Sequence, residues 1–154
     1  MSNHLQSVQL IMQTLGPSTP EIDAIIQSEE SSWALQFADE SVIVIDWADN
    51  PPRLVLSATL GRPAEDARLA VYQALLSYNL LWKETGGLKT ALAGKLGEVV
   101  LFLELYSDPL YDTELRRVLL ELVKVASVWR NYVAAEGAPQ GQAQIDSDNM
   151  HLRA

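Results

Sequence analysis

Three segments of the chain repeat apolar residues at the spacing of an α-helix. The first covers residues 3–15 and is expected to end at the Gly-Pro pair that follows it. The second covers residues 63–85, and the third, which has the clearest stripe, covers residues 112–134. Leu10 lies off the stripe of the first segment, so it is either a single exposed leucine or part of an apolar docking patch.

Two other regions carry the patterns of β-strands. Residues 31–60 contain three short apolar runs separated by turn-like sequences, which predicts a three-stranded meander. The middle run, residues 41–47, is rich in β-branched residues and is expected to be buried on both faces. Residues 88–107 contain two further runs around a four-residue loop with two glycines, which predicts a hairpin.

Residues 17–30 fit two descriptions. The run from Ser18 to Glu21 has the form of a helix capping box, and three isoleucines follow it at helical spacing, which predicts a short helix. A partly ordered loop fits the same residues equally well. The elements together predict a single α+β domain in the order α-β-β-β-α-β-β-α, with an antiparallel sheet flanked by helices.

The composition fits a folded chain of this kind. The 154 residues, of which 48% are hydrophobic, suit one domain over residues 1–135 with a flexible acidic and polar tail over residues 136–154. The absence of cysteine excludes disulfides, a thiol nucleophile and thiolate metal sites. Twenty Asp and Glu against eleven Lys and Arg give a net charge of −9, which argues against nucleic-acid binding and against anionic membrane surfaces.

The sequence offers no targeting or membrane-spanning segment. The N-terminus lacks a basic stretch followed by an apolar core, and no apolar run approaches the ~20 residues of a membrane span. A soluble, cytoplasmic protein without membrane insertion is therefore expected.

No catalytic or cofactor motif emerges from the residues. His4 and His151 lack the spacing of a triad or a metal site, and no glycine-rich phosphate-binding loop occurs. Asp46 interrupts an apolar strand; it either marks where that strand is exposed or is an inward acid paired with a base such as Arg53. Asn79 interrupts the most apolar helix, as a satisfied buried amide that holds a neighbouring loop or as a ligand-binding group. We therefore expect no enzyme, no metal and no cofactor.

The second half of the helix expected at residues 63–85 is apolar nearly all round. Such a helix must be covered on more than one side, and a small domain has only one sheet to cover it. The other side therefore requires a second chain or a bound segment, which is the first indication that the protein is not a monomer.

At this point several runs resemble a known family. The run LLSYNLLWKETGG, residues 75–87, resembles the apolar helix and glycine turn of the Tir chaperone (CesT-type) family, the class I chaperones of bacterial type III secretion. RLVLSATLG, residues 53–61, resembles the third strand of that family and its exit. The hairpin and the leucine-rich final helix follow in the order of the family, so the resemblance covers about residues 3–135.

The resemblance implies a non-enzymatic homodimer in the bacterial cytoplasm. Such chaperones bind an N-terminal segment of a secreted effector, keep it extended and deliver it to the secretion apparatus, with the secretion ATPase as a further candidate partner. Strand addition at a sheet edge and apolar pockets beside the first helix would hold the segment.

From the predicted faces we place the partner-binding groove at Leu10, Val42, Val44 and Trp47. The alternative function is a small acidic adaptor that binds a folded cytosolic partner.

We place the dimer interface on the second helix and the nearby hairpin, with Val71, Leu75, Tyr78, Leu81 and Trp82 as its residues.

Overall fold

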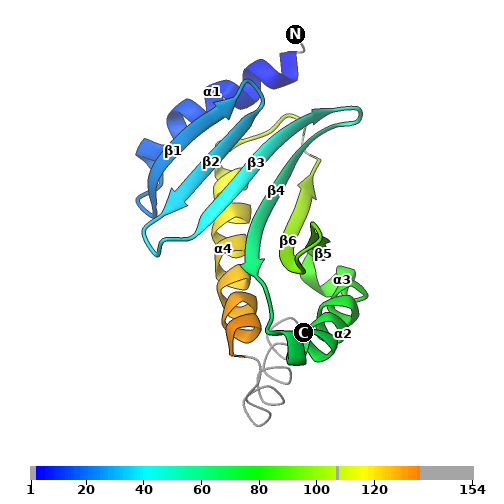
Figure 1. Cartoon of the computed structure of the whole chain (residues 1–154). Coiled ribbons are helices and arrows are strands. Elements are labelled where there is room, and N and C mark those ends of the chain that lie inside the picture. The colour runs from blue at the N-terminus through cyan, green and yellow to red at the C-terminus, as the bar shows by residue number, and fades with distance from the viewer. Residues whose placement is uncertain (1–2, 107, 136–154) are drawn as a thin grey trace. The chain divides into compact units, whose positions relative to one another are not determined.

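The computed structural model describes residues 3–106 and 108–135 of the chain (Figure 1). The chain forms two compact units, of which unit 1 runs from the N-terminus to Ala58 and from Glu104 to Lys124. Unit 2 contains Thr59–Leu103 and the residues from Val125 onward. The tail expected at residues 136–154 lies outside the described residues.

Four helices, one 3₁₀ turn and six strands make up the described part of the chain. Their bounds are α1 Asn3–Ser18, β1 Ile22–Glu29, β2 Ser32–Phe37, β3 Val42–Asp49, β4 Pro52–Gly61, η1 Glu65–Ala67, α2 Arg68–Asn79, α3 Trp82–Thr85, β5 Lys89–Ala93, β6 Glu98–Leu105 and α4 Asp112–Ala134. The strands form one sheet in the order β1-β2-β3-β4-β6-β5. The β1–β2, β2–β3, β3–β4 and β5–β6 pairs are antiparallel, so the predicted α+β class, meander and hairpin are confirmed.

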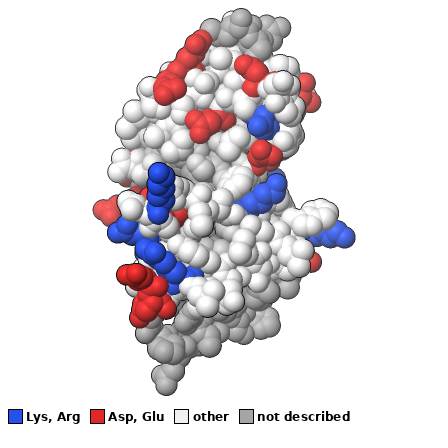
Figure 2. Space-filling view, turned by 45° about the vertical axis from the view of Figure 1, so that its right-hand side comes forward, with Lys and Arg blue, Asp and Glu red and all other residues white. Residues whose placement is uncertain are grey.

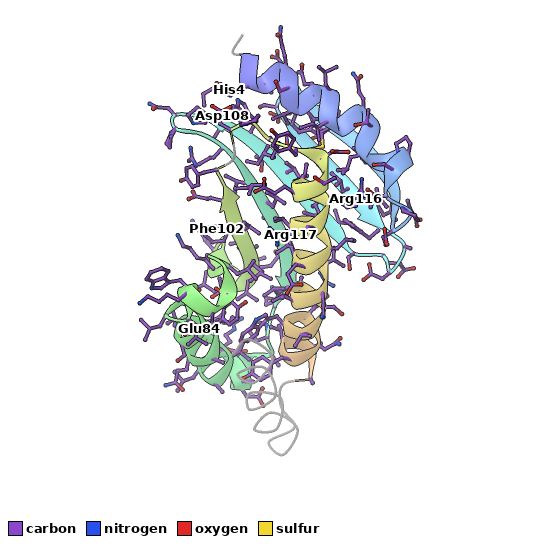
Figure 3. All side chains as sticks on the ribbon, turned by 180° about the vertical axis from the view of Figure 1, so that it is seen from behind. His4, Glu84, Phe102, Asp108, Arg116 and Arg117 are labelled. Carbon is purple, nitrogen blue, oxygen red and sulfur yellow. The ribbon has the colours of Figure 1, made fainter. Side chains whose placement is uncertain are left out.

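In unit 1 the helices cover one face of the strands. Trp33 pairs with Ile45 and Leu35 with Ile43, and directly paired residues of antiparallel strands share a face. These four side chains are 3% exposed or less. Figure 1 shows the strands in front of α1 and α4, and Figure 3, seen from behind, shows both helices in front of the strands. The apolar stripes of the two helices therefore form the core of unit 1 with this face.

The opposite face of these strands is open. The alternating residues of β3 show this, because Val42 is 45% exposed and Val44 is half-buried, whereas Ile43 and Ile45 are fully buried. The prediction that this strand is buried on both faces is wrong, because within unit 1 the helices pack on one side only.

Residues 22–29 form a strand, so both descriptions of residues 17–30 are wrong there, and the order gains a strand after α1. The register of β1 shifts between Ile22 and Ala24, so that Ile22 pairs with Phe37 and Ile25 with Leu35. Asp23 is the extra residue of this bulge, and it places two isoleucines three residues apart on the same face of the sheet. A spacing of three is also a helical spacing, which explains why the sequence pattern was misleading.

The helix expected at residues 63–85 is divided into η1, α2 and α3. At the end of α2, the amides of Leu80 and Leu81 bond the carbonyls of Ser77 and Tyr78, three residues back. This tighter spacing is that of a 3₁₀ turn and ends the α-helix. The chain then ends α3 at Gly86, whose φ of 69° is the left-handed conformation expected of a helix-terminating glycine.

The first helix also differs slightly from its prediction, because α1 continues past the Gly-Pro pair to Ser18. Ser18 Oγ donates a hydrogen bond to the Leu15 carbonyl at 3.1 Å, which satisfies one of the last carbonyls of the helix. The final helix has the predicted bounds.

Unit 2 is held together by contacts among aromatic side chains and by hydrogen bonds from the side-chain amide of Asn79. Tyr78 of α2 meets Trp129 of α4 edge to face at 5.0 Å between ring centroids. Asn79 Nδ2 donates to the Thr90 carbonyl at 3.1 Å, and the Thr90 amide donates to Asn79 Oδ1 at 2.7 Å. The Thr90 hydroxyl donates to the Leu75 carbonyl at 2.9 Å. The interpretation of Asn79 as a satisfied amide is confirmed, with strand β5 in place of a loop.

We expect Asn79→Ala to destabilise the protein, because it removes two hydrogen bonds that attach β5 to α2. The expected loss is ~1–3 kcal/mol in the free energy of unfolding. Urea unfolding at a fixed protein concentration measures it as a lower midpoint with an unchanged slope. Ser77→Ala, at an exposed position of the same helix, is the matched control. Equal urea midpoints for the two variants would show that the hydrogen bonds between Asn79 and Thr90 do not stabilise the protein.

Candidate functional site

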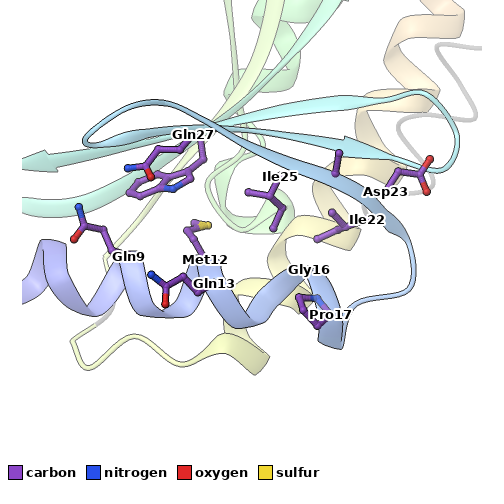
Figure 4. A pocket seen from close by; sticks show the side chains of 11 residues that line it. Gln9, Met12, Gln13, Gly16, Pro17, Ile22, Asp23, Ile25 and Gln27 are labelled. Carbon is purple, nitrogen blue, oxygen red and sulfur yellow. The ribbon is translucent and has the colours of Figure 1, made fainter.

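A groove runs between α1 and the edge strand β1 in unit 1 (Figure 4). Its volume is about 740 Å³, and its apolar lining includes Met12 of α1, Ile25 of β1 and Trp33 of β2. The bulge at Asp23 brings Ile22 into the same lining. The groove is therefore wide enough for several side chains of another polypeptide.

Polar side chains hold one end of this groove in place. Gln9 of α1 and Gln27 of β1 both donate through Nε2 to the backbone carbonyl of Glu30, at 3.3 and 3.1 Å. Figure 4 shows these two glutamines together at one end, with Pro17, Ile22 and Asp23 towards the other. The hydrogen bonds connect α1 to the β1–β2 turn and so fix the width of the groove at that end.

One wall of the groove is an end strand of the sheet. Among the described strands β1 has β2 as its only neighbour, so alternate backbone N–H and C=O groups of β1 point away from the sheet. An extended polypeptide can pair with such an edge and place alternate side chains in an adjacent pocket. The groove thus combines a backbone template with a floor on which apolar side chains lie beside glutamines.

The four predicted partner-binding residues lie on three different surfaces. Val42 and Val44 are on the open face of the sheet. Leu10 is 63% exposed on the solvent side of α1. Trp47 lies on the covered face, where its ring stacks on His4 at 6.1 Å and it lines a small cavity of about 90 Å³. The structure therefore brings Val42 and Val44 together and separates them from Leu10 and Trp47.

The open face carries an apolar row next to Val44. Ile26 pairs with Ala34, and Ala34 pairs with Val44, so three neighbouring strands each contribute one apolar side chain. Ile26 is 59% exposed. Sequence reasoning missed Ile25 and Ile26 as site residues because it did not identify β1 as a strand.

The five predicted dimer-interface residues divide into two groups. Val71, Leu75 and Tyr78 are 0%, 4% and 1% exposed, so they belong to the core of unit 2 itself. Trp82 is 55% exposed and Leu81 is half-buried.

The outward stripe of α2 is a different set of leucines. Leu69, Leu76 and Leu80 are 72%, 69% and 80% exposed. Their spacing of seven and four residues places them on one side of the helix. The sequence could not distinguish the two sides, because the helix is apolar on both.

Asp46 is exposed on the open face, where it accepts a hydrogen bond from Ser32 Oγ at 2.6 Å. Arg53 instead pairs with Glu104, with 3.4 Å between Nε and Oε1. The interpretation of Asp46 as the point where the strand is exposed is confirmed, and the alternative pairing with Arg53 is wrong. The Tyr106 hydroxyl donates to Glu104 at 2.9 Å, and this bond raises the pKa of Tyr106 above its ordinary value.

In residues 3–106 and 108–135, no group of three or more His, Asp or Glu side chains is placed to hold a metal ion. Within the same part of the chain, no helix is both long enough and apolar enough to cross a membrane.

Comparison with known proteins identifies the class. Residues 21–130 match the model of the Tir chaperone protein (CesT) family. No curated protein sequence gives a significant match. The chain therefore belongs to the CesT family of chaperones, as the sequence resemblance implied, and it is of the type III secretion class.

Two solved structures have the same fold. The crystal structure of the ExsC–ExsE complex matches with a TM-score of 0.68 at 19% identity, covering 90% of this chain and 99% of the other. The structure of the HopA1–SchA chaperone–effector complex matches with a TM-score of 0.65 at 15% identity, covering 85% of this chain and 98% of the other.

Proposed function

We propose that this chain is a non-enzymatic, cytoplasmic bacterial chaperone that binds the N-terminal segment of a type III secreted effector. The observation that carries the proposal is the groove between α1 and the edge strand β1, because it joins an open backbone edge to the apolar side chains of Met12, Ile25 and Trp33. Family membership and the fold shared with a chaperone–effector complex support it. The family resemblance also supports a further part of the proposal, in which the chaperone delivers the effector to the secretion ATPase.

A segment paired with β1 would contact both faces of the sheet. Successive side chains of a strand point to opposite faces, so one set enters the groove beside Ile25 and the other lies beside Ile26. The row from Ile26 to Val44 then extends the contact across the open face, where Val42 is a neighbour. Leu10 and Trp47 would meet only parts of the effector outside the added strand.

Pairing with β1 keeps the effector segment extended. The backbone of an added strand is fully extended, and its ordering has an entropic cost that the apolar contacts offset. The segment is thereby kept from folding or aggregating until it is delivered.

The proposal includes a homodimer formed through α2 and α3. Leu69, Leu76, Leu80 and Trp82 present large apolar side chains to solvent, which in a monomer is an unusual concentration. Leu81 lies between them, and Val71, Leu75 and Tyr78 support the helix from inside unit 2. A second copy with the same stripe would cover this surface symmetrically.

We expect the tagged protein, purified from its own organism, to retain one secreted protein through a protease-protected N-terminal segment. Ile25→Glu, in the groove, and Val44→Asp, on the open face, each place a charge against apolar contacts. Both should lower the recovered partner at least ~10-fold while the chaperone stays folded. Quantitative mass spectrometry and circular dichroism measure the two effects.

Leu96→Asp adds a charge at an exposed leucine of unit 2 and is the matched control, with partner recovery expected to be unchanged. Recovery of a folded cytosolic protein, unaffected by Ile25→Glu or Val44→Asp, would contradict the chaperone proposal and favour an adaptor.

We expect the double variant Leu76→Glu/Leu80→Glu to be monomeric, because it places four like charges across a symmetric interface. Light scattering at several protein concentrations should show that the dissociation constant of the dimer rises at least ~100-fold. Leu10→Glu replaces a leucine of similar exposure in unit 1 and should remain dimeric. A double variant that stays dimeric would place the interface elsewhere.

A further inference from the structure

The acidic charge of this protein is concentrated in one part of the chain. Residues 1–52 contain eight Asp and Glu residues and no Lys or Arg. Unit 1 as a whole has thirteen acidic residues against four basic ones, a net charge of −9, which equals that of the whole chain. Figure 2 shows Asp and Glu side chains, in red, at several separate places on the visible surface. Unit 1 is the unit that contains the groove.

Carboxylates lie at both ends of the groove strand. Glu21 and Asp23 are exposed at the start of β1, and Asp23 lines the groove. Glu29 and Glu30 are exposed where β1 turns into β2. The opposite wall is α1, whose only ionisable side chain is that of His4. Between these ends the groove is uncharged, with Met12, Ile25 and Trp33 beside three glutamines, Gln9, Gln13 and Gln27. Each end of its strand carries two negative charges.

Within the described residues, no Lys or Arg of unit 1 forms an ion pair with the carboxylates at the ends of β1. Arg116 donates to Ser18 Oγ at 3.3 Å near the end of α1, but it also pairs with Asp112 at 3.8 Å. Arg53 pairs with Glu104. Arg53 and Arg116 therefore each pair with a carboxylate of β6 or α4. Within residues 3–106 and 108–135, Arg117 and Lys124, the other two cations of unit 1, form no ion pair with a carboxylate of β1, so these carboxylates remain available for a partner's cations.

We propose that the groove selects a cationic segment: a strand with apolar side chains at alternate positions and Lys or Arg at both ends. This inference rests on the proposed function and adds the chemistry of the effector segment. The apolar residues would meet Met12, Ile25 and Trp33, and the basic residues would meet the carboxylates at the two ends of β1. Exposed charges of this kind contribute more to selectivity and association rate than to affinity.

The same charges would exclude wrong partners. An acidic segment, or the β1 edge of a second chaperone molecule with identical carboxylates, would bring like charges together along the strand. Charged residues on an edge strand are a common protection against edge-to-edge pairing of sheets.

The test is a selection from a phage-displayed library of random peptides on the full-length protein, run in parallel on wild type and on Ile25→Glu. Peptides that bind wild type but not Ile25→Glu depend on the groove. We expect these peptides to have alternating apolar residues flanked by Lys or Arg. Their binding should weaken as salt is raised.

The affinity of one selected peptide for variants of the chaperone then measures how much the carboxylates contribute to binding. Glu21→Gln/Asp23→Asn and Glu29→Gln/Glu30→Gln should each weaken binding ~3–10-fold by calorimetry at low salt. Glu65→Gln/Asp66→Asn, which removes two charges from unit 2, should stay within about twofold. A peptide in which the basic flank that meets Glu29 and Glu30 is changed to Glu should bind more weakly to wild type, and Glu29→Lys/Glu30→Lys should restore its affinity by bringing opposite charges together.

The failures of the two proposals are distinguishable. Groove-dependent peptides without Lys or Arg enrichment, or insensitive to the four neutralised carboxylates, would overturn the cationic selectivity and leave the chaperone proposal standing. A library without any peptide sensitive to Ile25→Glu would overturn the groove itself as the docking site.

Discussion

The candidate site depends on how the edge strand β1 is held between β2 and α1. The bulge at Asp23 places both Ile22 and Ile25 on the face that α1 covers, and pairing with β2 fixes that register. Because no other strand in the described part of the chain pairs with the far side of β1, the same strand that completes the core of unit 1 also presents an unpaired backbone edge. Without the bulge, one isoleucine would point to the open face, and the groove would lose part of its apolar lining.

The two units contribute different surfaces to the molecule. Unit 1 contains the groove, the open sheet face and the whole net negative charge. Unit 2 has a core of aromatic side chains around Trp129 and exposes the leucine stripe of α2. A partner segment and a second copy of the chain would therefore meet surfaces of different chemistry, one acidic at its ends and the other dominated by exposed leucines.

The sequence predicted those elements whose pattern is long and one-sided. The helix at residues 112–134 has its predicted bounds, because its apolar stripe repeats over more than five turns. β1 was missed because its bulges interrupt a short alternating pattern. The buried side of α2 could not be chosen, because leucines occupy both of its sides and the covered side is set by distant residues, Trp129 of α4 and Thr90 of β5. The groove lies between α1 and β1. Because α1 was predicted and β1 was not, the sequence predicted one wall of the groove and missed the other.

The bulges of β1 also bear on how a bound segment leaves. Register shifts on either side leave a regular run of only four residues, Ala24 to Gln27, along which a ladder of backbone hydrogen bonds can form without interruption. A strand pulled from one end breaks such bonds one after another, whereas a strand pulled sideways must break them together. A short ladder that opens by peeling needs little force at each step, so a motor that draws on the free end of a bound chain could strip it from this edge without unfolding the protein that holds it.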